Sequence, residues 1–250
     1  MANKFSAKTT YGTRAKLGLI VPPTNTVNEA EWQQIIPNNI TLHVTRMRLH
    51  ADSKSEEGKK ALYADIEKST NDLAQAGLSS IAYGCTAGSM VQPLNLLSDL
   101  MTGISGLPCV TTAESIVCAL NSLGVRKISI ATPYHDALNK HEVEFLKSNG
   151  FETINIAGLG IGVGGPHEYI QIAQIPADKI RDHVLSVDHL EAEAILISCT
   201  DFPSLLMIES LENELGKPVI SSNQVTFWAA LRAAGVKDIF DGFGRLMRKI

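Results

Sequence analysis

An internal duplication limits the folds open to this 250-residue chain more than any other feature of its sequence. Residues 119–125 (ALNSLGV) match residues 230–236 (ALRAAGV). Three more pairs follow in the same order at offsets of 110 to 114 residues: Pro108 with Pro218, Pro23 with Pro133, and Cys85-Thr86 with Cys199-Thr200. A repeat of this length is too long for a solenoid unit and fits two similar α/β units. We therefore expect two related halves.

Short β-branched runs alternate with longer segments of helical apolar spacing along the chain. The runs predict strands at residues 17–21, 41–47, 80–83, 109–110, 128–131, 153–157, 194–197 and 219–220. Helices are predicted at residues 56–75, 112–123, 138–148, 177–190, 203–215 and 224–234. This alternation is typical of parallel sheets. The expected fold is α/β, with two pseudo-symmetric, four-stranded, flavodoxin-like halves: residues 16–113 plus 222–250, and residues 114–221.

The composition excludes several classes of protein. The 22 Lys+Arg against 26 Asp+Glu give a net charge of −4 with no basic stripe, so nucleic acid is not an expected partner. The apolar runs are far shorter than the roughly 20 residues that span a bilayer, so no membrane segment is expected. Residues 1–14 lack the apolar stretch of a secretory signal. We expect a cytoplasmic protein with free thiols and, because no His or Cys pair has ligand spacing, no metal.

Two of the four cysteines stand at matching places in the two halves. Cys85 follows the strand predicted at 80–83, and Cys199 follows the strand predicted at 194–197. Ligands of open parallel sheets bind beyond the carboxyl ends of the strands, so both thiols are expected in one cavity. Each cysteine also precedes a predicted helix start, where free N–H groups lower a thiol's pKa and bind anions such as carboxylates. Cys109 and Cys118 are expected in the core.

Other polar residues near the predicted strand ends allow two interpretations each. Asn25 and Thr26 either bind a ligand or cap the next helix. Tyr134 and Asn139 either contact a ligand or serve packing and solvent. Residues 158–165 contain a formal GxGxxG pattern, but it lies late in the chain and Pro166 follows it, so a mobile loop is expected rather than a dinucleotide site. His167, in the same segment, is either catalytic or exposed.

Four segments carry a resemblance in combination. They are GLIVPPTNTVNE at 18–29, GCTAGS at 84–89, ATPY at 131–134 with Asn139, and SCTD at 198–201. Together they resemble the maleate cis-trans isomerase group of the aspartate/glutamate racemase superfamily, which is related to the arylmalonate decarboxylases. The resemblance covers nearly the whole chain. It implies a homodimer that needs no cofactor and has its active site between two α/β halves.

The resemblance also implies a reaction and a set of site residues. Cys85 is expected as the nucleophile that adds to an alkene carbon of maleate, and Cys199 as the opposing acid and base. The carboxylates of this small dicarboxylate are expected to be held by backbone N–H groups beside the cysteines and by Asn25, Thr26, Thr86, Tyr134, Asn139 and Thr200. Where the isomerases show an Asp-Asn pair, this chain has Pro166-His167, and His167 is the expected donor in its place.

Three other functions stay open at this point. A two-cysteine amino-acid or hydantoin racemase would use one thiolate to remove an α-proton and the opposite thiol to return one. An arylmalonate-type decarboxylase would need only one thiol to protonate one face, so the presence of both cysteines argues against pure decarboxylation. A non-catalytic carboxylate-binding module is possible because fold alone does not fix function.

Overall fold

The eight predicted strands are all present, and they form two separate parallel sheets. The structure is a computed structural model that describes residues 9–50 and 55–250. The first sheet has the order β2-β1-β3-β4 and the second has the equivalent order β6-β5-β7-β8. The strands are β1 (Ala15–Val21), β2 (Ile40–Arg46), β3 (Ser80–Tyr83), β4 (Cys109–Thr111), β5 (Lys127–Tyr134), β6 (Glu152–Ile161), β7 (Ala194–Ile197) and β8 (Val219–Ser221). The α/β fold of two four-stranded parallel halves is thereby confirmed.

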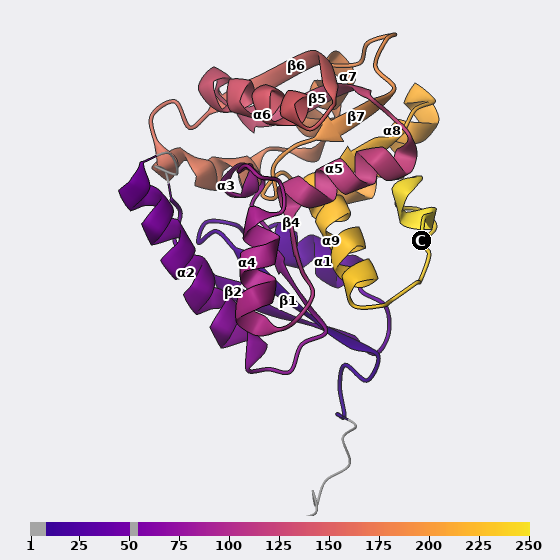
Figure 1. The fold of residues 1–250 in the computed structure, drawn as a ribbon. Coiled ribbons are helices and arrows are strands. Elements are labelled where there is room, and N and C mark those ends of the chain that lie inside the picture. The colour runs from indigo at the N-terminus through magenta and orange to yellow at the C-terminus, as the bar shows by residue number, and fades with distance from the viewer. Residues whose placement is uncertain (1–8, 51–54) are drawn as a thin grey trace, which may run out of the picture.

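Helices flank both sheets, and the second sheet lies above the first in Figure 1. The α-helices are α1 (Asn28–Ile35), α2 (Glu56–Ala74), α3 (Thr86–Ser89), α4 (Leu96–Ser105), α5 (Thr112–Leu123), α6 (Asp136–Ser148), α7 (Ala177–Ser186), α8 (Ile208–Leu215) and α9 (Ser222–Ala233). The 3₁₀ helices of the described residues are η1 (Pro166–Gln174), η2 (Leu205–Met207) and η3 (Leu246–Arg248). The predicted helix at 203–215 is therefore a 3₁₀ turn followed by α8, and the one predicted at 177–190 ends at Ser186.

The duplication is visible in the way equivalent helices begin. Thr111 caps α5 by accepting a hydrogen bond from the N–H of Glu114 at 3.3 Å, and Ser221 caps α9 in the same way from Gln224 at 3.3 Å. These two helices cross the space between the sheets and touch through a bond from Thr226 Oγ1 to Thr112 Oγ1 of 3.0 Å. The largest apolar core contains buried residues of both halves, so the halves pack as one body.

Three local expectations are wrong. Cys118 is exposed on α5 instead of buried in the core. Residues 158–161 belong to β6 and not to a loop, and position 158 has room only for glycine, because a Cβ would lie 2.1 Å from the carbonyl oxygen of Tyr134. The helices α1 and α4 were not predicted. Half of the buried face of α1 is polar, since Asn28 and Glu31 are buried beside Trp32 and Ile35, so its apolar periodicity is weak.

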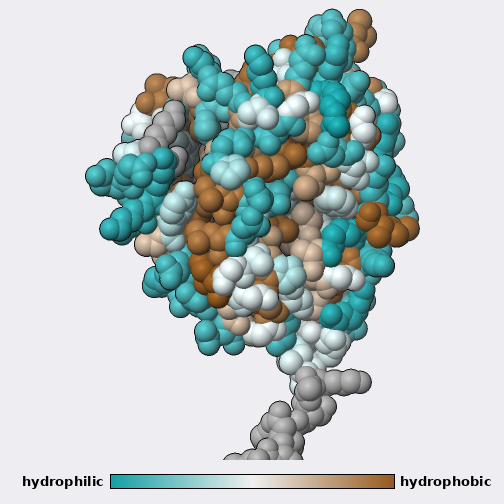
Figure 2. Space-filling view, in the orientation of Figure 1, coloured by the Kyte–Doolittle hydropathy of each residue, from teal (hydrophilic) through white to brown (hydrophobic). Residues whose placement is uncertain are grey.

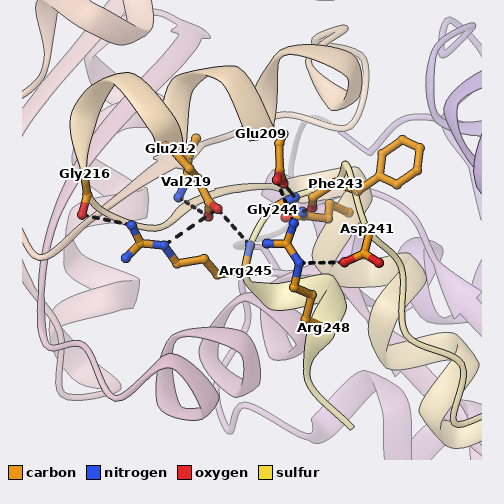
Figure 3. A network of polar contacts seen from close by, with 10 residues as sticks. Glu209, Glu212, Gly216, Val219, Asp241, Phe243, Gly244, Arg245 and Arg248 are labelled. Carbon is orange, nitrogen blue, oxygen red and sulfur yellow. Dashed lines mark hydrogen bonds and ion pairs between the residues drawn. The ribbon is translucent and has the colours of Figure 1, made fainter.

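The segment that follows α9 is held against α8 by two glutamates. Glu209 accepts a hydrogen bond from the N–H of Gly244 at 2.7 Å, and Glu212 accepts one from the N–H of Arg245 at 2.8 Å (Figure 3). Arg248 pairs with Glu209 at 2.6 Å. The C-terminal segment thus ties α9 to the second half, and the division of the chain at residues 113 and 221 stays a prediction.

The surface carries no membrane-spanning signal in the described residues. None of their helices is both long enough and apolar enough to cross a bilayer. Hydrophilic residues cover most of the face seen in Figure 2, and hydrophobic residues form smaller separate patches on it. The expected absence of a secretory signal concerns residues 1–14, of which residues 1–8 lie outside the described part of the chain.

Candidate active site

A cavity of about 390 Å³ lies between the two halves, lined by residues at the carboxyl ends of β1, β3, β5 and β7. Cys85 lines it from the first half and Cys199 from the second. The prediction that the two cysteines share one cavity is confirmed. This is the edge of a parallel sheet at which ligands bind, and here two such edges face one another.

The loops that carry the cysteines are bonded directly to each other. Thr200 Oγ1 donates to the carbonyl of Gly84 at 3.1 Å, which joins the residue after Cys199 to the residue before Cys85. The hydroxyl of Ser222, at the start of α9, accepts from the N–H of Cys199 at 3.1 Å and from Thr86 Oγ1 at 2.9 Å. The positions of the two thiols are therefore fixed by buried hydrogen bonds.

Cys85 is half-buried and lies two residues after β3, at the N-cap of the four-residue helix α3. Burial raises the pKa of its thiol, while the N–H of Gly88 and the hydroxyl of Tyr83 lower the pKa in part by hydrogen bonding to the sulfur. Gly88 must be glycine at this place, because a Cβ would lie 2.9 Å from the sulfur and 2.5 Å from the Tyr83 hydroxyl. The backbone of Gly88 therefore lies close enough for its N–H to donate a hydrogen bond to the thiolate form of Cys85.

Cys199 is buried and has a strained backbone. Its φ of 132° lies in a region that costs a non-glycine residue about 1–3 kcal/mol. Burial raises the pKa of its thiol to about 12, although the Tyr134 hydroxyl and the N–H of Asp201 lower the pKa by hydrogen bonding. The negative charge of Asp201 raises it further. Cys199 therefore holds its proton firmly at neutral pH.

The expectation that helix N-termini lower both thiol pKa values is wrong. The helix after Cys85 has only four residues, and no regular helix begins directly after Cys199, since η2 starts at Leu205. Desolvation is the largest influence on both sulfurs and raises both pKa values. The donors that favour a thiolate are individual N–H and hydroxyl groups rather than helix dipoles.

Asn25 caps the next helix and also lines the cavity. Its Oδ1 accepts from the N–H groups of Val27 at 3.1 Å and Asn28 at 3.0 Å, which caps α1. Its Nδ2 donates to Thr200 Oγ1 at 3.1 Å, and the residue lines the cavity. Thr26 is exposed and does not line the cavity; its N–H donates to Asp201 Oδ1 at 2.8 Å. Asp201 therefore helps to cap α1 rather than its own helix.

Tyr134 lines the cavity, and Asn139 lies behind it. Thr132 Oγ1 donates to Asn139 Oδ1 at 2.6 Å and accepts from the N–H of Tyr134 at 3.1 Å. Asn139 Nδ2 also reaches the carbonyl of Tyr134 at 3.5 Å. Asn139 is not among the lining residues, so its contacts support the end of β5 that presents the Tyr134 ring.

The segment after β6 brings a different residue to the cavity from the one expected. His167 is exposed and does not line the cavity, whereas Tyr169, two residues later in η1, does. The charges of Cys199 and Cys85 both raise the pKa of Tyr169, after the larger effect of burial. Its phenol therefore lies within electrostatic reach of both sulfurs. Sequence reasoning missed it because the irregular path of residues 162–168 sets which side chain points inward.

Other lining residues also lacked a sequence signal. They are Tyr83 on β3, Arg48 and His50 after β2, and two histidines of the α6 region, His135 at its N-cap and His141 within it. Only Tyr83 has a positional hint, since it is the last residue of β3 and stands two residues before Cys85. Among the residues that the structure describes, no three His, Cys, Asp or Glu side chains are grouped so as to hold a metal ion.

Glu142 on α6 is a buried acid behind this site. Only 1% of the residue is exposed, so its carboxyl group is shielded from solvent. Burial raises its pKa to about 7, with the hydroxyl of Ser198 acting in the opposite direction. Between pH 4.5 and 7 the folded state therefore holds a proton that the unfolded chain has lost.

Replacing Glu142 by glutamine is expected to flatten the pH dependence of stability. Because the folded pKa is the higher one, wild-type stability from this group is greatest at low pH and falls as pH rises through about 7, by about 3 kcal/mol in all. Urea unfolding at pH 5 and pH 8 measures this. The change between the two pH values should be smaller in Glu142→Gln than in Glu144→Gln, an exposed control on the same helix. Equal changes in the two variants would contradict a buried neutral acid.

The structure places this chain in the class of α/β proteins built from two similar halves that share one cavity. A thiol from each half lies in the wall of that cavity. The comparisons with known proteins agree with that class. The family model described as arylmalonate decarboxylase matches residues 17–247. The chain therefore belongs to the arylmalonate decarboxylase family.

Its relatives include isomerases as well as decarboxylases. Maleate isomerase of Nocardia farcinica is 28% identical over 94% of this chain and 96% of its own length. Arylmalonate decarboxylase of Bordetella bronchiseptica is 28% identical over 92% and 95%. A solved cysteine-to-serine variant of the Nocardia farcinica maleate cis-trans isomerase, with a covalently bound succinylcysteine intermediate, has a TM-score of 0.80 at 26% identity and covers 94% of this chain and 98% of its own. The resemblance and the prediction of an enzyme are confirmed.

Proposed function

We propose that this protein isomerises maleate to fumarate without a cofactor, through addition of a cysteine to the double bond. The observation that carries the proposal is the pair Cys85 and Cys199, one from each half, in the wall of a single cavity. A decarboxylase needs one thiol to protonate one face of its intermediate, whereas addition and proton transfer on opposite faces use two. The succinylcysteine in the Nocardia farcinica variant supports the same chemistry.

In the proposed reaction, the thiolate of Cys85 forms a bond to one alkene carbon. The π electrons move onto the adjacent carboxylate as an enediolate, and the thiol of Cys199 donates a proton to the second carbon. The former double bond is now single and rotates. Cys199 takes the proton back, the carbon–sulfur bond breaks, and fumarate leaves. Both thiols end as they began, so the cycle needs no co-reactant.

The environments of the two thiols support this division of roles. Cys85, which is half-buried as a residue, has the Gly88 N–H and the Tyr83 hydroxyl to stabilise its thiolate. Cys199 is buried beside the carboxylate of Asp201, which raises its pKa to about 12 together with the larger effect of burial. A nucleophile must lose its proton and an acid must keep one, so unequal surroundings suit unequal tasks.

The substrate carboxylates require donors, and the cavity offers them on both sides. Asn25 and Tyr134 line it, as do Thr86 and Thr200. The hydroxyls of both threonines are bonded to protein groups, so we assign their contribution to backbone N–H groups. Donors aimed at a carboxylate also stabilise the enediolate charge, which is commonly the largest catalytic contribution.

We assign to Tyr169 the carboxylate contact expected of His167. Tyr169→Phe removes only the hydroxyl and is expected to raise KM for maleate about tenfold, the usual cost of one hydrogen bond to a charged group. His167→Ala is expected to leave KM unchanged, because that side chain is exposed outside the cavity. Steady-state kinetics on both variants test this, and the reverse order of effects would contradict the assignment.

The reaction itself is tested by proton NMR of the reduced protein with maleate in heavy water. We expect the maleate vinyl signal to fall and the fumarate signal to rise. Deuterium exchange at the α-carbon of an amino acid, without action on maleate, would instead indicate a racemase. Release of carbon dioxide from an arylmalonate would indicate a decarboxylase. A cytoplasmic location and a homodimer stay predictions.

A further inference from the structure

The cavity is larger than a four-carbon diacid requires. Its volume of about 390 Å³ falls in the range of about 300–1,000 Å³ that is typical of sites for drug-sized ligands. It would hold on the order of a dozen water molecules at about 30 Å³ each. The thiols, Asn25 and Tyr134 form only part of its wall, so the rest of the space is available to a substituent on the substrate.

A charged cluster forms part of the remaining wall. Arg48 and His50 lie just after β2, and both line the cavity. His50 Nε2 is 2.9 Å from Asp65 Oδ2 of α2, and Arg48 Nε is 3.7 Å from the same oxygen. The His50 side chain is only 8% exposed. Its ring is therefore held in place by a hydrogen bond inside the wall.

Asp65 lies beside both side chains, but it accepts a hydrogen bond only from His50 and not from Arg48. A guanidinium has five N–H donors, and 3.7 Å is too long for a hydrogen bond. The Arg48 side chain is 74% exposed, so it stands at the mouth of the cavity, where its fork can turn toward an entering carboxylate. Nearby lining residues are apolar, notably Met47 and Leu62, and suit a methylene group.

We propose that the cavity accepts a cis-butenedioate that bears a third carboxylate on a short substituent, and that Arg48 and His50 bind this third carboxylate. The simplest such acid is 2-(carboxymethyl)maleate. The inference rests on the proposed function for the chemistry at the thiols, and that chemistry is unchanged. Cys85 adds to the alkene, the single bond rotates, and the same thiolate leaves. No atom is gained or lost, and the product is the trans tricarboxylate.

Binding to a protein without turnover tests the subsite separately from the reaction. Calorimetry on Cys85→Ser, or on Cys85→Ala if the serine variant is unstable, gives the affinities for maleate and for 2-(carboxymethyl)maleate. We expect the tricarboxylate to bind about tenfold more tightly, because it gains a charge-assisted contact. Adding Arg48→Gln or His50→Gln should lower the ratio of the two affinities severalfold. Lys68→Gln, which removes an exposed charge elsewhere on α2, should leave the ratio unchanged.

The outcomes separate this inference from the proposed function. Equal affinity for the two acids, or a ratio that neither Arg48→Gln nor His50→Gln changes, would overturn the subsite even in an enzyme that isomerises maleate. Selective binding that depends on Arg48 would support the subsite even if NMR shows the wild-type protein to be inactive on both acids. In that second case only the proposed reaction would be overturned.

Discussion

Cys85→Ser is expected to abolish maleate isomerisation, with kcat lower by about 10⁴-fold or more, the size of effect seen when an enzyme loses its nucleophile. Serine occupies nearly the same volume, so the hydrogen bonds that fix the loop can persist. Its hydroxyl, however, does not ionise near neutral pH and adds poorly to an alkene. The measurement is the initial rate of fumarate formation at saturating maleate, at equal concentrations of folded protein.

The chain offers matched controls for this substitution. Cys109 and Cys118 are free thiols that do not line the cavity. The same exchange at either position should leave kcat close to that of the wild type. Full turnover by Cys85→Ser, or an equal loss in all three variants, would show that Cys85 is not the nucleophile.

Cys199→Ser is expected to lower kcat by about 10²- to 10⁴-fold, the range that general acid–base groups contribute. Cys85 keeps its sulfur in this variant, so addition to maleate can still occur. What is lost is the thiol that exchanges a proton with the second carbon. We therefore expect slow turnover together with accumulation of a covalent adduct, which stopped-flow quenching and intact-protein mass spectrometry can detect.

The two cysteine variants should therefore lose different steps of the reaction. Cys85→Ser should bind maleate and form no adduct, whereas Cys199→Ser should form an adduct and turn over slowly. Identical behaviour of both, with no adduct in either, would point to proton transfer between two equivalent thiols, as in a racemase.

The fold follows from the sequence because its signals are local and repeated. The β-branched runs recur in both halves, as do the capping residues Thr111 and Ser221. An element predicted in one half therefore supports the equivalent element predicted in the other. The helix α1 escaped prediction because half of its buried face is polar. Glu31 on that face accepts from the N–H groups of Ser204 at 2.7 Å and Leu205 at 2.9 Å, which come from the other half. A contact between distant segments leaves no periodic pattern.

The site was predictable only where strand ends determine it. Cys85, Cys199, Asn25 and Tyr134 all follow from the rule that ligands bind beyond the carboxyl ends of parallel strands. Tyr169 does not, because the path of the chain after β6 decides which residue faces the sulfurs. The pKa shifts of the two thiols could not be predicted from the sequence either, because desolvation by the surrounding fold is their largest cause.

The claim at the centre of this account is that Cys85 adds to the alkene. The most direct test is to incubate the Cys199→Ser protein with maleate, quench it with acid, digest it, and map the modified peptides by mass spectrometry. We predict that the peptide containing Cys85 gains the mass of one maleic acid molecule, while the peptides with Cys109 and Cys118 remain unchanged. Isomerase activity with no adduct on Cys85, or equal modification of all three cysteines, would contradict it.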